Sequence, residues 1–152
     1  MKEESSVKEE IIVLEAKESD YAALRDIYLK VRQAAFPWED PEQLKLEDFD
    51  TSTEGELILA AFINNEIVGF ASIWVPEKFI HNLFVRVEFQ GKGVGTALVN
   101  EAKNRVGLPL TLKCVKGNTP AIGYYQSHNW RIDKEDRDEH GPYYWMKYDT
   151  AD

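Results

Sequence analysis

The stretch Phe79-Ile80-His81-Asn82-Leu83-Phe84-Val85 continues, four residues later, into Gln90-Gly91-Lys92-Gly93-Val94-Gly95 and then into Thr96-Ala97-Leu98-Val99. Its apolar, β-rich first part has the composition and length of a strand. Between Val94 and Val106, apolar residues recur at helical spacing, which predicts an amphipathic helix with one face on a sheet. The stretch therefore predicts a strand, a glycine-rich turn and a helix in succession.

The glycine-rich turn has the properties of an anion site. Gly91, Gly93 and Gly95 stand at alternate positions, where the missing side chains allow a ligand to approach the backbone closely. The first N–H groups of the following helix have no partner within it, and the positive end of the helix dipole favours phosphate. The sequence therefore predicts a phosphate-containing ligand here, and a tight turn without a ligand is the alternative.

The spacing of the turn excludes two familiar nucleotide-binding motifs. A P-loop needs Ser or Thr after its lysine, but Gly93 follows Lys92. The dinucleotide fingerprint G-x-G-x-x-G needs a third glycine, but Leu98 stands three residues after Gly95. The pattern that fits is Q/R-x-x-G-x-G/A, formed by Gln90, Gly93 and Gly95.

With this motif the chain resembles the GNAT superfamily of N-acetyltransferases, whose central strand ends in L-x-V, here Leu83-Phe84-Val85, shortly before the loop. In that family the loop binds the diphosphate of acetyl-CoA, and the strand end binds the pantetheine arm like an added strand. The resemblance implies that the strand end, the loop and the helix start form an acetyl-CoA site. The implied residues are Leu83, Phe84, Val85, Gln90, Gly91, Lys92, Gly93, Val94, Gly95 and Thr96.

A second motif of the family, N-x-x-A-x-x-[FLY]-Y, is matched from Asn118 to Tyr125. The resemblance implies that Asn118 contacts the pantetheine or orders the helix start, and that Tyr125 points at the thioester sulfur. A phenol with a pKa of about 10 can donate a proton to a thiolate of similar basicity, so Tyr125 is the predicted general acid. A core aromatic is the alternative. The backbone N–H of Val85 is the predicted donor to the oxyanion.

His81 is the predicted general base. It alternates with Leu83 and Val85 along the predicted strand, so we expect all three side chains on one face, near the thioester. A histidine can accept the ammonium proton near neutral pH. The H-x-L-x-V pattern is similar to that of serotonin N-acetyltransferase, which uses a histidine in its proton path. A histidine with a purely structural role is the alternative.

The acceptor pocket is predicted from aromatic residues. Phe36-Pro37-Trp38 resembles the loop of ribosomal-protein alanine N-acetyltransferases, which implies that Phe36 and Trp38 contact a peptide amine. Those enzymes carry a catalytic glutamate on the strand before the asparagine motif, where this chain has Lys113. Either His81 replaces that glutamate or the substrate differs. Trp74 is a further candidate for the pocket wall, and plain packing of these aromatics is the alternative.

The flanking segments predict the other elements. Asn64-Asn65-Glu66 between two apolar runs predicts a hairpin, since asparagine tolerates positive φ. Leu110 to Val115 can reach the Phe79–Val85 strand only through the intervening helix, so those two strands should be parallel. Thr119 is the predicted cap of the next helix. Two strands around the charged turn from Asp136 to Gly141 complete the chain.

The 152 residues, 43% of them apolar, predict a single domain over residues 1–152. The chain has no run of about 18 apolar residues and begins with charged residues, so we expect a cytoplasmic protein and no membrane partner. The polar residues 1–10 are expected to fray. Cys114, the single cysteine, is interpreted as buried packing.

The net charge of −9 argues against a nucleic-acid partner and slightly favours cationic acceptors such as amines. Three scattered histidines and the lack of a C-x-x-C motif predict no metal site. The family resemblance makes a homodimer one arrangement to consider, but no interface signature is visible in the sequence.

The order of these elements resembles that of the GNAT family, which implies its α+β fold: a mixed, largely antiparallel sheet of about seven strands, splayed between the fourth and fifth, with about four flanking helices. The function that the resemblance implies is acetyl-CoA-dependent N-acetyl transfer to a primary amine, by direct attack in a ternary complex. Two alternatives remain. One is a GNAT module that binds CoA as a sensor or structural partner without transfer, and the other is a different phosphate-binding β/α domain.

Overall fold

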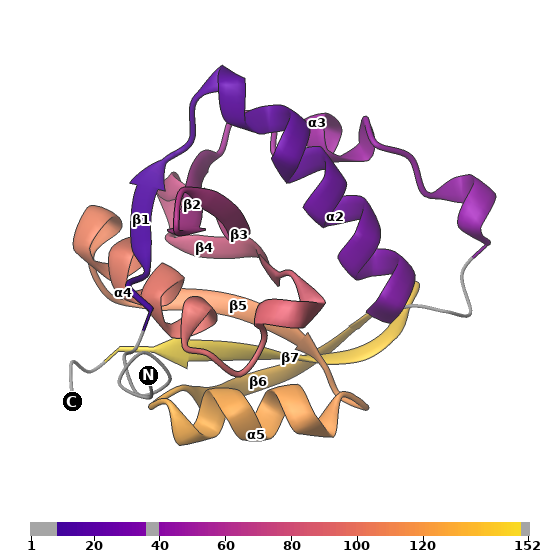
Figure 1. Ribbon diagram of the computed structural model, residues 1–152. Coiled ribbons are helices and arrows are strands. Elements are labelled where there is room, and N and C mark those ends of the chain that lie inside the picture. Colours follow the sequence, from indigo (N-terminus) through magenta and orange to yellow (C-terminus); the bar gives the residue numbers. More distant parts are fainter. Residues whose placement is uncertain (1–8, 36–39, 150–152) are drawn as a thin grey trace, which may run out of the picture.

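The computed structural model describes residues 9–35 and 40–149, and a mixed seven-stranded sheet forms its centre (Figure 1). The strands are β1 (Ile12–Glu15), β2 (Leu57–Ile63), β3 (Glu66–Trp74), β4 (Phe79–Val85), β5 (Leu110–Val115), β6 (Arg131–Asp138) and β7 (Gly141–Tyr148). The helices are α2 (Tyr21–Ala35), α3 (Asp48–Ser52), α4 (Val94–Val106) and α5 (Thr119–Ser127). The predicted α+β class and the predicted strand–turn–helix succession are both confirmed.

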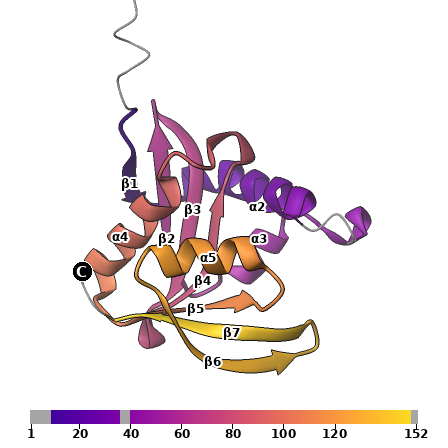
Figure 2. The same cartoon turned by 90° about the horizontal axis from the view of Figure 1, so that it is seen from below.

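The strand order is β1-β2-β3-β4-β5-β7-β6, and every neighbouring pair is antiparallel except β4 and β5. Asn64 and Asn65 have φ angles of 51° and 68°, so the hairpin between β2 and β3 is the one that their tolerance of positive φ predicts. Figure 2 shows the β6–β7 hairpin along one border of the sheet and β1 at the other.

Helices cover both faces of the sheet, and on each face a separate apolar cluster lies between the helices and the sheet. On one face, Leu24 and Ile27 of α2 and Phe49 of α3 are fully buried against Phe70 of β3. On the other face, α4 packs its buried residues, among them Leu98, against the sheet, and α5 packs against the same cluster. Within the described ranges, no helix combines the length and apolarity needed to span a bilayer.

The parallel strands β4 and β5 separate directly after one residue pair. A single residue pair, Phe79 with Thr111, joins β4 to β5. The Thr111 N–H donates to the carbonyl of Lys78 at 3.0 Å, just before that pair. Beyond Phe79, the rest of β4 therefore has a sheet partner only in β3. This is the predicted splay between the fourth and fifth strands, and it leaves one edge of β4 available for a ligand.

Two local features differ from the predictions. The cap of α5 is Asn118, whose Oδ1 accepts the Ala121 N–H at 3.3 Å, instead of Thr119. The turn of the last hairpin shrinks to residues 139–140, because β6 and β7 run further than expected. The expected fraying concerns residues 1–10, of which 1–8 lie outside the described ranges.

Gly69 brings β3, β4 and α4 together at close range. A Cβ built at Gly69 would lie 2.8 Å from the backbone oxygen of Phe84 and 3.2 Å from Val94 Cγ1. We expect Gly69→Ala to lower the free energy of unfolding by about 1–3 kcal/mol, because the backbone of β4 must shift. Urea unfolding measures this effect. Gly117→Ala is the control, since nothing lies within 4 Å of its Cβ; equal stabilities of the two variants would contradict the prediction.

Candidate functional site

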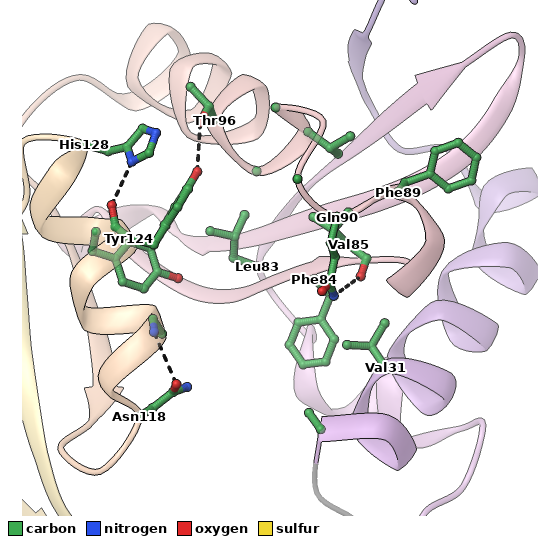
Figure 3. A pocket seen from close by; sticks show the side chains of 17 residues that line it. Val31, Leu83, Phe84, Val85, Phe89, Gln90, Thr96, Asn118, Tyr124 and His128 are labelled. Atoms are coloured by element: carbon green, nitrogen blue, oxygen red, sulfur yellow. Dashed lines mark hydrogen bonds between the residues drawn. The ribbon is translucent and has the colours of Figure 1, made fainter.

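A cavity of about 720 Å³ lies between the N-terminal end of α4, the end of β4 and α5, and extends to the last turns of α2 (Figure 3). Every residue that the sequence implied for acetyl-CoA binding lines this cavity, except Lys92. Those residues are Leu83, Phe84, Val85, Gln90, Gly91, Gly93, Val94, Gly95, Thr96, Asn118 and Tyr125. The fold thus gathers two motifs that are more than twenty residues apart in the sequence.

The start of α4 presents backbone donors to this cavity. Gly93, with φ 90°, is the N-cap, and its carbonyl accepts the first helical hydrogen bond, from the Ala97 N–H at 3.0 Å. The N–H groups of Val94, Gly95 and Thr96 therefore have no carbonyl partner within the helix. All three residues line the cavity. Together with the helix dipole, these donors form an anion site.

The glycines of the loop fit a ligand lying against the backbone. Gly91 and Gly93 have φ angles of 80° and 90°, a conformation that other residues adopt only with strain. At Gly95 a Cβ would make only an ordinary contact, 3.5 Å from Tyr124 Oη, so the glycine serves instead to keep the cavity wall free of a side chain. The residues therefore fit an extended, polar cofactor such as acetyl-CoA.

The end of β4 offers backbone groups on its free edge. The Arg86 N–H donates to the carbonyl of Val68 on β3 at 2.8 Å. Because bonding alternates along an antiparallel pair, the N–H and C=O of Val85 point away from β3. The side-chain amide of Gln90 donates to the Val85 carbonyl at 3.0 Å, which ties the loop to the strand end. The Val85 N–H is directed toward the splay.

Tyr125 of α5 lines the cavity and also packs against the core cluster beside Trp130, with ring centroids 5.8 Å apart. Burial is the main reason why the pKa of its phenol is raised well above the usual value, and Cys114 and Tyr124 add to the effect. The phenol therefore carries its proton throughout the neutral range. Both predicted roles, core aromatic and cavity residue, are compatible with this position.

Six residues that line the cavity were missing from the predicted site, and two of them, Tyr124 and His128, make hydrogen bonds there. The hydroxyls of Tyr124 and Thr96 lie 2.8 Å apart, which joins α5 to the start of α4. His128 Nδ1 donates to the Tyr124 carbonyl at 2.7 Å, and the two rings lie 4.1 Å apart (Figure 3). A signal was present, since Ala121, Tyr124 and His128 recur at helical spacing on one face of α5.

His81 does not line the cavity, and the expectation that it shares a face with Leu83 and Val85 is wrong. The register between β3 and β4 shifts at this point, so that His81 is an extra residue between Ile80 and Asn82. Such a bulge reverses the alternation of side chains. Ile80 consequently packs in the same cluster as Leu83, while His81 lies on the face of α2 and α3.

The predicted acceptor residues are only partly described. Phe36 and Trp38 lie outside the described residues, although Ala35, which directly precedes them, lines the cavity. Trp74 does not line the cavity; its side chain is 40% exposed, and it pairs with Phe79 across β3 and β4. Lys113 places its ammonium 5.2 Å from the ring centroid of Trp145. In the part of the chain that the structure describes, no three His, Cys, Asp or Glu side chains gather as a metal would require.

Solved structures with the same fold support the topology. A GCN5-related N-acetyltransferase from Rhodopseudomonas palustris superposes with a TM-score of 0.75 at 19% identity, covering 95% of this chain and 98% of that one. The PaiA N-acetyltransferase of Thermoplasma acidophilum, solved in complex with coenzyme A, gives 0.74 at 15% identity, with coverages of 93% and 99%. The ribosomal-protein-S18-alanine N-acetyltransferase of Escherichia coli gives 0.67 at 21% identity, with coverages of 94% and 97%.

The sequence itself matches a known family. A comparison with curated protein sequences gives no significant match. The sequence profile of the acetyltransferase (GNAT) family, however, matches residues 21–130, a range that begins with α2 and includes both motifs of the cavity. The chain therefore belongs to the acetyltransferase (GNAT) family.

Proposed function

We propose that the protein is an acetyl-CoA-dependent N-acetyltransferase that transfers the acetyl group to a primary amine. The observation that carries this proposal is the composition of one cavity. The free N–H groups of the α4 start, the unpaired edge of β4 and the protonated phenol of Tyr125 all meet there. These are the groups needed to hold a diphosphate, an extended amide-containing arm and a departing thiolate.

The acetyl-CoA site would be built from backbone more than from side chains. The N–H groups of Val94, Gly95 and Thr96 would bind the diphosphate, and the free edge of Leu83 to Val85 would bind the pantetheine arm. Asn118 would act by ordering the start of α5. When bound, acetyl-CoA supplies an activated acetyl thioester. The single-domain organisation and the possibility of a homodimer stay predictions.

Two groups of the chain would assist transfer at the thioester end. Tyr125 Oη holds a proton at neutral pH and would give it to the departing sulfur. Burial that raises the pKa of this phenol also raises the basicity of a thiolate in the same surroundings, so the two remain matched. The Val85 N–H, directed into the splay, would donate to the carbonyl oxygen of the acetyl group without reorganisation.

The position of the single cysteine supports direct attack by the amine instead of a covalent acetyl-enzyme intermediate. Cys114 is 6% exposed, and burial raises the pKa of its thiol. A nucleophilic cysteine needs the opposite, a lowered pKa and access to the substrate. A covalent acetyl-cysteine step therefore has no support, and the proposal keeps a ternary complex of enzyme, acetyl-CoA and amine.

The acceptor would approach from the face of α2 and α3, because α4 and α5 enclose the cofactor side of the cavity. Its class is a small primary amine or a peptide N-terminus. The peptide option is supported by the Phe36-Pro37-Trp38 motif, and the structurally similar E. coli protein acetylates ribosomal-protein alanine according to its name. The negative net charge favours cationic acceptors of either kind. Cytoplasmic location also stays a prediction.

Release of free CoA tests the function directly. Purified protein is offered acetyl-CoA with phenethylamine, spermidine, kanamycin or short peptides that begin with alanine, and a thiol reagent follows the free CoA. We expect amine-dependent CoA release with at least one acceptor, and mass spectrometry should find the acetylated product. Protein that is protected by CoA against thermal unfolding, yet releases none with any amine, would contradict the proposal.

A CoA-binding protein without transferase activity is the competing function. The observation in its favour is Lys113, which stands at the position where the resemblance to alanine acetyltransferases implies a catalytic glutamate. The same two measurements distinguish the candidates. Thermal protection together with amine-dependent CoA release supports the enzyme, whereas protection alone supports the binding protein. A lack of protection by CoA would disfavour both and leave a different phosphate-binding domain.

A further inference from the structure

Glu56 carries a buried carboxylate that the proposed reaction leaves unused. It directly precedes β2, and its side chain is only 9% exposed. Its Oε2 lies 2.8 Å from His81 Nδ1, which belongs to the bulge of β4. Its other oxygen, Oε1, is buried and has no hydrogen-bond partner among the described residues. Among the described residues, the carboxylate thus has one hydrogen-bond partner, a partly exposed imidazole.

Stability does not explain this carboxylate. Leaving a buried polar atom without a partner is unfavourable, and more so for a charged group. An ion pair with a partly exposed imidazole gains little in return. A glutamate of this kind persists at a cost, and such positions concentrate at functional sites. Its single contact with His81 points to a role exercised through that imidazole.

The contact determines which nitrogen of His81 can accept a proton. A carboxylate only accepts hydrogen bonds, so Nδ1 must carry a hydrogen and donate it to Glu56. Nε2, on the far side of the ring from Glu56, then has the free lone pair that a base requires. The carboxylate also stabilises the imidazolium that forms when Nε2 takes up a proton, as the buried aspartate does in serine-protease triads.

The surroundings keep the imidazole in a fixed orientation at the splay. His81 is the second residue beyond Phe79, the last paired residue of β4, and the two rings stack with centroids 5.8 Å apart. The neighbouring Asn82 donates from its amide to Ser72 at 2.8 Å and to Ser52 at 3.1 Å, which anchors the bulge to β3 and α3. The side chain of His81 remains 41% exposed. An acceptor arriving on the face of α2 and α3 would meet Nε2.

We propose that Glu56 is the positioning residue of a carboxylate–histidine pair in which His81 Nε2 takes the proton from the acceptor ammonium. An N–H bond of the ammonium breaks, a new bond forms between that hydrogen and Nε2, and the amine is left neutral for attack. The imidazolium afterwards returns its proton to water. This inference rests on the proposed acetyltransferase function and adds its proton acceptor, together with the residue that orients it.

Turnover of the variants tests the pair with the most active amine of the acceptor panel. Glu56→Gln is expected to lower kcat at least about tenfold, because the glutamine amide would donate to Nδ1 and move the ring hydrogen to Nε2. The KM for acetyl-CoA should change little, since Glu56 does not line the cavity. Glu56→Asp, which keeps the carboxylate, should recover part of kcat. Glu54→Gln, the same change on an exposed neighbour, is the control.

A double variant separates a positioning role from a structural one. If the two residues act as a unit, Glu56→Gln should lower kcat no further in the His81→Ala background. Independent, multiplicative losses would overturn the proposal. So would full kcat in Glu56→Gln. In those cases the wild-type enzyme still releases CoA with the amine, so the proposed function survives.

The tautomer of His81 gives a readout that does not need turnover. Two-bond ¹H–¹⁵N correlation spectra of the ¹⁵N-histidine-labelled protein should show neutral His81 with its hydrogen on Nδ1 in the wild type and on Nε2 in Glu56→Gln. The His81→Ala spectrum identifies the resonance. Wild-type protein with the hydrogen on Nε2 would overturn the proposal. If the protein shows the Nδ1 tautomer but acetylates no amine, Glu56 still positions the ring of His81. The proton transfer to His81 and the proposed function would then both be overturned.

Discussion

The Tyr125→Phe variant is expected to show a kcat about 10²- to 10⁴-fold below that of the wild type, with nearly unchanged affinity for acetyl-CoA. Tyr125 lines the cavity, and burial raises the pKa of its phenol, so at neutral pH the wild-type residue offers a proton and the phenylalanine offers none. The ring remains in place, so packing against Trp130 is preserved. Single-turnover CoA release measures the chemical step, and calorimetry with CoA measures affinity.

A tyrosine outside the cavity provides the control for this loss. Tyr144 of β7 is partly buried against the same core cluster but does not line the cavity. Tyr144→Phe should therefore leave the rate of single-turnover CoA release within about a factor of two of the wild-type rate. This difference corresponds to at most about 0.5 kcal/mol. If Tyr125→Phe releases CoA as fast as Tyr144→Phe does, the phenol is not the proton source, and Tyr125 is a core aromatic only.

The raised pKa of Tyr125 also has a consequence for stability at alkaline pH. A tyrosine in the unfolded chain has a pKa of about 10, whereas burial raises the pKa of Tyr125 in the folded protein. The folded state thus keeps a proton that the unfolded state loses above about pH 10, so this stabilising contribution is complete below that pH and disappears as the pH rises above it. Urea unfolding should show a steeper alkaline loss in the wild type than in Tyr125→Phe.

The cofactor side of the site could be predicted from sequence because its determinants are local. The strand composition of residues 79–85, the glycines of the loop and the helical spacing after Val94 each act over a few residues. The structure accordingly has β4 and α4 where these patterns put them. The second motif could be placed opposite the first only because the intervening strand must be parallel to β4.

The acceptor side could not be predicted in the same way, because it depends on pairing between distant segments. Strict alternation along β4 put His81 on the cofactor face, but one bulge against β3 moved it to the other face. Nothing near Glu56 in the sequence indicates that its carboxylate reaches a histidine 25 positions later. The link from Tyr124 to Thr96 spans 28 positions and is equally invisible to local patterns.

The second large effect is expected at the start of α4, where Gly95→Val should weaken acetyl-CoA binding about a hundredfold. The added side chain would project from the cavity wall near Tyr124, where a ligand must approach the N–H groups of Gly95 and Thr96. A hundredfold loss corresponds to about 2.7 kcal/mol, which lies within the range expected for losing one or two hydrogen bonds to a charged group, at about 1.5–3 kcal/mol each. Calorimetric titration with acetyl-CoA measures the change.

Gly95 separates binding from folding better than its neighbours do. Gly91 and Gly93 have positive φ, so a side chain there would strain the loop and confound the result, whereas Gly95 lies within the helix and its Cβ would meet only an ordinary contact. Gly123→Val on α5 is the matched control, since its Cβ meets nothing within 4 Å and it does not line the cavity. A folded Gly95→Val protein that binds acetyl-CoA as tightly as Gly123→Val does would mean that the diphosphate lies elsewhere, and the function proposed for this cavity would lose its basis.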